Sequence, residues 1–224
     1  AVIVSTARTG LAKSFRGGFN ETEAPAMAGH VVREVVKRAG IDPASVADVL
    51  FGAAAQQGTQ AYCLGRLAAI AGGLPPTVAG MAMERQCASG LLTIATAAKS
   101  IMCNELDIAI AGGVESISIT QNKHKNTFRS QSEAVKALDP AAYIPMLETS
   151  EVVAERYNIS REAQDDYSFH SKMRTAAAQK NGIFDNEIVP MKTTMSVFNK
   201  ETIETTFKET IVDRDDCNRA DTTY

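Results

Sequence analysis

The chain has 224 residues, of which 45% are hydrophobic and 22% are charged, and its formal net charge at pH 7 is −3. This length is enough to bury one large hydrophobic core, or one core with an inserted domain. The weak negative charge without a basic block excludes the usual signature of a nucleic-acid-binding protein, and no apolar run is long enough for a membrane span.

The first half of the chain alternates between strand and helix patterns. Apolar runs predict strands over 1–6, 48–54, 77–82 and 107–112, and helical periodicity predicts helices over 25–39, about 60–71 and 88–103. Gly40 is expected to end the first helix, and Asp42 to cap a new helical start. Strands that alternate with helices predict an α/β fold whose mostly parallel sheet is covered by helices.

Cys87 lies where the third predicted strand turns into a helix, directly after the polar turn 84–86. The first N–H groups of that helix and its dipole favour the thiolate over the thiol, and the thiolate is the nucleophilic form. The helix is small or apolar on nearly every side, so we expect it to be buried. Gly90 is expected to allow a close approach in its first turn. The alternative interpretation is an inert cysteine that serves as a small hydrophobe.

The other cysteines give no sign of a metal site or a disulfide framework. The four are Cys63, Cys87, Cys103 and Cys217. Their spacing matches no metal-binding pattern, and their density is too low for a disulfide scaffold. We therefore expect free thiols, no bound metal and a cytoplasmic location, or the mitochondrial matrix or peroxisome if the source is eukaryotic.

Periodicity fails from Glu115 to about Tyr143, where the composition turns to Ser, Asn, Lys, Gln and Thr. An irregular segment of this length inside a compact chain is usually functional or mobile. It carries a small basic cluster, made of Lys123, His124, Lys125 and Arg129. The simplest interpretation of such a cluster is a solvated loop.

The last third is predicted to contain two helices and a hairpin. The helices are expected over about 149–157 and 161–181, a strand around 187–191, and hairpin strands over 193–198 and 202–207, joined by a turn at 199–201. Thr149 or Ser150, and then Ser160, are the expected N-caps, and Gly182 closes the second helix. In the polar tail, Asp213, Asp215 and Asp216 lack the calcium-loop pattern and are expected to solvate a loop.

Several motifs together resemble the thiolases, the family of acyl-CoA acetyltransferases and 3-ketoacyl-CoA thiolases. ERQCASG around Cys87 is followed by a small-residue helix and then by DIAIAGGVES. In the family's order the chain also has VIVSTARTG, GRLAAIAGGLP, IPM, TSEVVAERYNISREAQD, AAAQKNGIFDNEIVP and DRDDCNRADTT. The resemblance implies a thiolase-like N-terminal layered α/β domain with a mixed sheet over 1–114, and an inserted α+β loop domain over 115–224.

The resemblance also implies a set of functional residues. Cys87 matches the nucleophile that takes the acyl group as a thioester, and Met146 matches a methionine that packs along the pantetheine of coenzyme A. Arg219 and Thr223 fall in the segment that touches the adenine-phosphate end. Coenzyme A and acyl-CoA are therefore expected as substrates in fatty-acid beta-oxidation, with no permanently bound cofactor. Leu147 stands where thiolases commonly have glycine, which is expected to change the backbone beside the pantetheine.

Partners follow from the same resemblance. Thiolases form dimers and tetramers, so a homodimer or homotetramer is expected, with the basic cluster beside coenzyme A or the dimer–dimer contact. The family's second half supplies a histidine in a Gly-His-Pro-like turn, an Asn-containing motif and a cysteine in Cys-x-Gly, and no Gly-His-Pro sequence occurs here. His30, His124 and His170 are interpreted as structural or solvated. We expect the N-terminal and loop-domain portion of a longer enzyme, from which the C-terminal half is absent.

Two alternatives stay open at this point. A ketoacyl synthase shares the layered fold and a cysteine at the same turn. A non-catalytic thiolase-like subunit that binds coenzyme A or serves assembly would also explain why the second half is missing.

Overall fold

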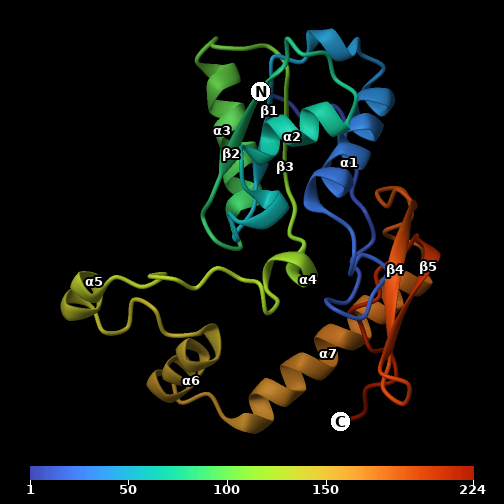
Figure 1. Ribbon diagram of the computed structural model, residues 1–224. Coiled ribbons are helices and arrows are strands. Elements are labelled where there is room, and N and C mark those ends of the chain that lie inside the picture. Colours follow the sequence, from blue (N-terminus) through green and yellow to red (C-terminus); the bar gives the residue numbers. More distant parts are fainter. The chain divides into compact units, whose positions relative to one another are not determined.

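The computed structural model describes residues 1–224, and Figure 1 labels the helices and strands. By packing, the chain divides into two compact units. Unit 1 comprises residues 1–125 and 184–217, and unit 2 comprises residues 126–183 and 218–224. The domain boundary between 114 and 115 was expected from the family resemblance, not from packing within this chain, and it stays a prediction.

A three-stranded parallel sheet lies at the centre of unit 1. Its strands are β1 (Asp48–Gly52), β2 (Ala79–Met83) and β3 (Ala109–Gly113), in the order β2-β1-β3. Leu50 of the central strand pairs with Met81 on one side and Ala111 on the other. A helix lies between each pair of successive strands, as parallel pairing requires a long crossover. The three predicted strands are confirmed, with small shifts of their ends.

One face of the sheet is covered by α1 (Ala24–Ala39) and α2 (Leu64–Ala71). Val49 and Phe51, alternate residues of the central strand, point to this face, because side chains alternate along a strand. The buried cluster consists of Ala24, Ala28, Val32, Val36, Val46, Val49, Phe51, Ala53, Leu64, Ala68, Ala69, Leu74 and Val78.

Local signals set the ends of these helices. Gly40 adopts a φ of 65° and donates its N–H to carbonyls at the end of α1, as predicted. The carboxylate of Asp42 accepts the Ala44 N–H at 2.9 Å and caps a short 3-10 helix, Pro43–Ser45. The helix expected from about residue 60 is instead a 3-10 turn, Gly58–Gln60, followed by α2 from Leu64.

The opposite face of the sheet carries α3 (Ser89–Met102). Its buried residues are Ser89, Thr93 and Ala97, which form one stripe toward the strands. Leu91 and Met102 are each 71% exposed. The expectation that this helix is buried on all sides is therefore wrong for this chain, because the chain supplies packing partners on one side only.

Residues 1–7 form no strand, although an apolar pattern predicted one over 1–6. Val2, Ile3 and Val4 are 83, 74 and 76% exposed. A strand needs a hydrogen-bonding neighbour, which an apolar run does not specify. The nearest pairing is a single bridge in which Arg8 N–H donates to Glu187 O at 2.9 Å.

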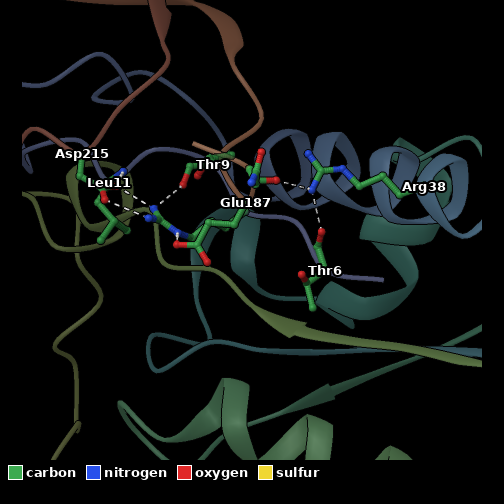
Figure 2. A network of polar contacts seen from close by, with 8 residues as sticks. Thr6, Thr9, Leu11, Arg38, Glu187 and Asp215 are labelled. Carbon is green, nitrogen blue, oxygen red and sulfur yellow. Dashed lines mark hydrogen bonds and ion pairs between the residues drawn. The ribbon is translucent and has the colours of Figure 1, made fainter. Parts of the chain in front are cut away.

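The Arg8 side chain joins the beginning of unit 1 to its end. Figure 2 shows the polar network around it and labels Asp215 and Glu187. The Arg8 guanidinium donates to both carboxylate oxygens of Asp215, at 2.7 and 3.0 Å, and to Glu187 at 2.8 Å. The Leu11 N–H also donates to Asp215 at 2.8 Å. The hydrogen bonds from Arg8 hold the pKa of the Asp215 carboxyl below its usual value. Asp215 was expected to solvate a loop, and that expectation is wrong because Arg8 is its partner.

A second arginine holds the same segment. Arg38, near the end of α1, donates to Thr6 O at 2.8 Å and to Asn186 O at 2.9 Å. Figure 2 shows its side chain directed at Thr6. Residues from α1 and from the return segment thus hold a stretch of chain that lacks a sheet partner.

The predicted hairpin is confirmed as β4 (Met191–Asn199) paired with antiparallel β5 (Glu204–Val212). It contacts the N-terminal part of unit 1, where Asn20 accepts the Ser196 N–H at 3.0 Å and donates to Ser196 O at 2.8 Å. The expected strand over 187–191 is wrong, since only Ile188 forms an isolated bridge there. Continuous strand pairing begins at Met191, which is paired with Val212.

Short helices interrupt the irregular segment after β3. These are α4 (Ile117–Thr120) in unit 1 and α5 (Glu133–Leu138) in unit 2. The two longer predicted helices are confirmed as α6 (Met146–Arg156) and α7 (Arg161–Lys180). No helix is both long enough and apolar enough to cross a membrane.

The caps of these helices were only partly predicted. Ser160 accepts the Ala163 N–H at 3.2 Å and caps α7, as expected. The prediction of Thr149 or Ser150 as the cap of α6 is wrong, because that helix already begins at Met146, directly after Pro145. The two hydroxyls instead donate to carbonyls four residues earlier, within the helix.

Candidate active site

Cys87 lies at the turn between β2 and α3, as the sequence predicted, and its thiol is free and exposed. Gln86 before it has a φ of 48°, a left-handed conformation that is uncommon outside glycine. Ala88 after it is the N-cap, and α3 begins at Ser89. The sharp turn therefore leaves the cysteine at the positive end of a 14-residue helix.

The Ser89 hydroxyl fastens this turn. It accepts the Arg85 N–H at 2.8 Å and donates to Gln86 O at 2.6 Å, and Ser89 is only 3% exposed. The turn before Cys87 is thus closed by a side chain two residues after it. The sequence indicated only a polar group here, because a serine in a first helical turn does not reveal which backbone groups it binds.

Two strand ends form the support under the turn. A Cβ placed on Gly52, at the end of β1, would lie 2.5 Å from the Ser89 backbone, so only glycine fits there. A Cβ on Gly113, at the end of β3, would lie 3.0 Å from the Gly90 Cα. The expected close approach to Gly90 is therefore made by the backbone of β3. Cys87 follows the carboxyl ends of parallel strands, where open α/β sheets bind ligands.

Comparisons with known proteins agree with this geometry. The chain matches the model of the thiolase N-terminal domain over residues 1–224. It is 38% identical to the peroxisomal 3-ketoacyl-CoA thiolase of Yarrowia lipolytica over 222 residues, which cover 96% of this chain and 50% of that protein. The 3-ketoacyl-CoA thiolase of Bacillus subtilis is 37% identical over 196 residues, 88% of this chain and 50% of that protein. The chain belongs to the thiolase family.

A solved structure shows the same fold. The acetyl-CoA acetyltransferase of Bacillus anthracis matches this thiolase chain with a TM-score of 0.78 and 31% identity, over 99% of this chain and 56% of that one. The layered α/β fold predicted from the sequence is therefore confirmed. This thiolase chain spans about half the length of the curated relatives it matches.

The other predicted site residues of the thiolase chain all lie in unit 2. Met146 is the first residue of α6 and is 75% exposed. Arg219 and Thr223 are exposed in the tail, which contacts α7. There Asn218 donates to Lys172 O at 3.2 Å, and the ring of Tyr224 packs edge-on against Phe169 at 5.9 Å. Their contact with coenzyme A stays a prediction.

The basic cluster is divided between the two units. Lys123, His124 and Lys125 are exposed in unit 1, and Arg129 is exposed in unit 2. Their expected role beside coenzyme A or a dimer–dimer contact also stays a prediction. No group of three or more histidine, cysteine or acidic side chains is arranged to hold a metal ion.

One polar arrangement near the site was missed in the sequence. Glu115, two residues after β3, accepts the Ala54 N–H at 2.8 Å and a side-chain N–H of Gln60 at 2.7 Å. It thereby joins the segments that follow two strands of the thiolase sheet. The available signal was an acidic residue directly after the glycine end of a strand, but its partners are 61 and 55 positions away.

Proposed function

We propose that the complete protein is an acyltransferase acting on coenzyme A thioesters, with Cys87 as the residue that carries the acyl group. The supporting observation is an exposed free thiol at the turn before α3, in a chain whose relatives are named 3-ketoacyl-CoA thiolases. The main alternative, a non-catalytic subunit that binds coenzyme A, keeps the fold but has no need for a reactive thiol at this turn.

In the degradative direction, the Cys87 thiolate attacks the 3-keto carbon of a 3-ketoacyl-CoA. The bond between carbons 2 and 3 breaks, and the acyl group stays on the sulfur as a thioester. The electron pair left on carbon 2 takes up a proton, which completes acetyl-CoA. The thiolate of a second coenzyme A then attacks the thioester, forms the shortened acyl-CoA and releases the Cys87 thiolate. The reverse sequence condenses two acyl-CoA molecules.

This chain contributes the nucleophile and its surroundings. The Cys87 N–H is proposed as a donor to the oxyanion that develops on the attacked carbonyl carbon, since the N–H groups of Ala88 and Ser89 already donate to Arg85 O and Gln86 O. The proton transfers belong to the histidine and second cysteine that the resemblance assigns to the second half of a thiolase. The proposal therefore includes a C-terminal thiolase half as a necessary partner of this chain.

Substrate binding is assigned to unit 2. The exposed thioether of Met146 offers an apolar contact for the pantetheine arm. The exposed guanidinium of Arg219 suits the phosphates at the adenine end, and the Thr223 hydroxyl is a neighbouring donor. The proposal includes a homodimer or homotetramer, as the family resemblance implies. It also includes a reducing compartment, since all four cysteines are free thiols.

The test is covalent labelling by substrate. The full-length protein is incubated with acetyl-CoA, digested and examined by peptide mass spectrometry, beside the variants Cys87→Ser and Cys103→Ser. Cys103 is the matched control, because it is also an exposed free thiol but lies at the opposite end of α3. We expect acetylation on Cys87 that persists in Cys103→Ser and disappears in Cys87→Ser. Binding of coenzyme A without any acetylation would favour the non-catalytic subunit.

A further inference from the structure

We propose that Glu115 is a positioning residue for Cys87, because its carboxylate holds together the two loop segments on which the cysteine turn rests. This inference rests on the proposed function and adds a residue to it. Glu115 lies outside the turn and outside the segments assigned to coenzyme A. Its claimed role is to fix backbone, not to touch substrate.

Both oxygens of the Glu115 carboxylate accept hydrogen bonds from the segment after β1. One accepts the Ala54 N–H at 2.8 Å, and the other accepts the Gln60 amide N–H at 2.7 Å. Gln60 is completely buried, and it also donates to Ala55 O at 2.8 Å. Its carbonyl oxygen accepts the Ser116 N–H at 2.6 Å. The end of β3 and the loop after β1 are thus tied by a closed set of hydrogen bonds.

The tied loop reaches the cysteine turn directly. Ala53 donates its N–H to Met83 O at 3.3 Å, and the Gln56 amide contacts the same carbonyl at 3.4 Å and Ala53 O at 2.8 Å. Met83 is the last residue of β2, at the entry to the turn that carries Cys87. The exit from the turn is supported by Gly52 and Gly113, each two residues before one of the tied positions. Glu115 therefore spans the supports on both sides of the turn.

A carboxylate is needed for this arrangement because both of its oxygens face donors. Glu115 forms no ion pair, so its role is to accept N–H groups. In a Glu115→Gln variant the side chain keeps its size, but its NH2 group meets one of the two donors. A buried N–H then loses its acceptor, which opens the loop.

The experiment compares Glu115→Gln with wild type and with the matched control Glu105→Gln, whose carboxylate is exposed and has no hydrogen-bond partner. The first readout is amide hydrogen exchange of peptides covering residues 53–60. The second is the rate of Cys87 acetylation by acetyl-CoA, measured with thermal unfolding of the same samples. We expect faster exchange and an acetylation rate lowered roughly 10- to 100-fold, as for a small misplacement of a reacting group, in variants that remain folded.

A reciprocal swap separates positioning from a general loss of stability. In the double variant Gln60→Glu with Glu115→Gln, the amide and carboxylate exchange places and can pair again, but the carboxylate at position 60 then faces Ala55 O, to which the Gln60 amide donates at 2.8 Å. Because two acceptors meet there, we expect only part of the acetylation rate to return. Acetylation of Glu115→Gln within about twofold of wild type, or a double variant that is as stable to heat as Glu115→Gln but is acetylated no faster, would overturn the inference.

The two proposals fail in different ways. If wild-type protein is not acetylated at all, the proposed function is wrong. The positioning role is then wrong too, even if hydrogen exchange over 53–60 is faster in Glu115→Gln. If wild type is acetylated but exchange over 53–60 is unchanged in Glu115→Gln, the proposed function stands and the positioning role is wrong.

Discussion

Arg8 and Asp215 form a two-pronged ion pair across 207 positions of sequence, with nitrogen–oxygen distances of 2.7 and 3.0 Å. The Asp215 side chain is only 14% exposed, and that of Arg8 is 30% exposed. The pair is therefore better shielded from water than a typical surface ion pair. Its position ties the first segment of unit 1 to the last, where no strand pairing does so.

Removal of this pair should destabilise unit 1. We expect Arg8→Gln or Asp215→Asn to lower the free energy of unfolding by about 1.5–3 kcal/mol, the range for hydrogen bonds to charged groups. Urea unfolding of both variants and of the double variant gives the coupling energy. Lys37→Gln removes a long, exposed 3.9 Å ion pair with Glu34 and should change stability little. A coupling energy near zero would mean that Arg8 and Asp215 act independently.

The same pair predicts a pH dependence. The folded pKa of Asp215 is lowered, chiefly by the hydrogen bonds from Arg8, so folding favours the charged carboxylate. Its stabilisation is fully present above the unfolded pKa of about 3.9 and is lost as pH falls through the folded value. As the pH is lowered from about 7 to about 3, the free energy of unfolding should therefore decrease more steeply in wild type than in Asp215→Asn. Parallel curves would contradict this assignment.

The glycine at the end of β1 should tolerate no side chain. A Cβ on Gly52 meets the Ser89 backbone at 2.5 Å, whereas a Cβ on Gly90 meets its nearest neighbour at 3.5 Å, an ordinary contact. We expect Gly52→Ala to cost about 1–3 kcal/mol through overpacking. Gly90→Ala should be neutral or slightly stabilising, since alanine is the better helix former. Thermal unfolding of both variants decides, and equal behaviour would contradict the close approach.

The hydroxyl of Ser89 should matter for both stability and reactivity. Ser89→Ala leaves the Arg85 N–H without its hydroxyl acceptor, while Gln86 O loses the hydroxyl donor but keeps the Ser89 N–H at 3.1 Å. We expect a loss of about 1–2 kcal/mol and slower acetylation of Cys87. Ser100→Ala, later in the same helix, is the control. If Ser89→Ala were acetylated as fast as that control, the turn would not depend on the hydroxyl.

Reversal of charge at Lys123, Lys125 and Arg129 tests the proposed role of the basic cluster. The three side chains are exposed, so each contact to a phosphate should be worth about 1 kcal/mol or less. We expect KM for the acyl-CoA substrate to rise several-fold, or the oligomer to dissociate in sedimentation velocity. Unchanged values of both would leave the cluster as a solvated loop.

Much of the fold was predictable because it depends on local pattern. Periodicity placed α1, α3, α7 and the three sheet strands, and the Ser160 and Gly40 caps follow from backbone chemistry. The turn at Cys87 was predictable for the same reason. Strand formation at 1–6 was not, since it requires a partner that the pattern does not name.

The details that hold the site together were not predictable from pattern. The Glu115 contacts with Ala54 and Gln60, and the Arg8 contact with Asp215, join residues whose separations are between 55 and 207 positions. No short-range propensity encodes such a pairing. The cap of α6 was missed for another reason, because its N-cap residue is Pro145, whose side chain makes no capping hydrogen bond.

Unit 1 is discontinuous in sequence, and this has a consequence for how the protein is made. Arg8 leaves the ribosome 207 positions before Asp215, which at about 5–20 residues per second is an interval of roughly 10–40 s. During that interval the backbone beside Arg8 lacks the ion pair that later secures it. The first segment of unit 1 can therefore reach its final position only after β5 and the residues that follow it have been synthesised.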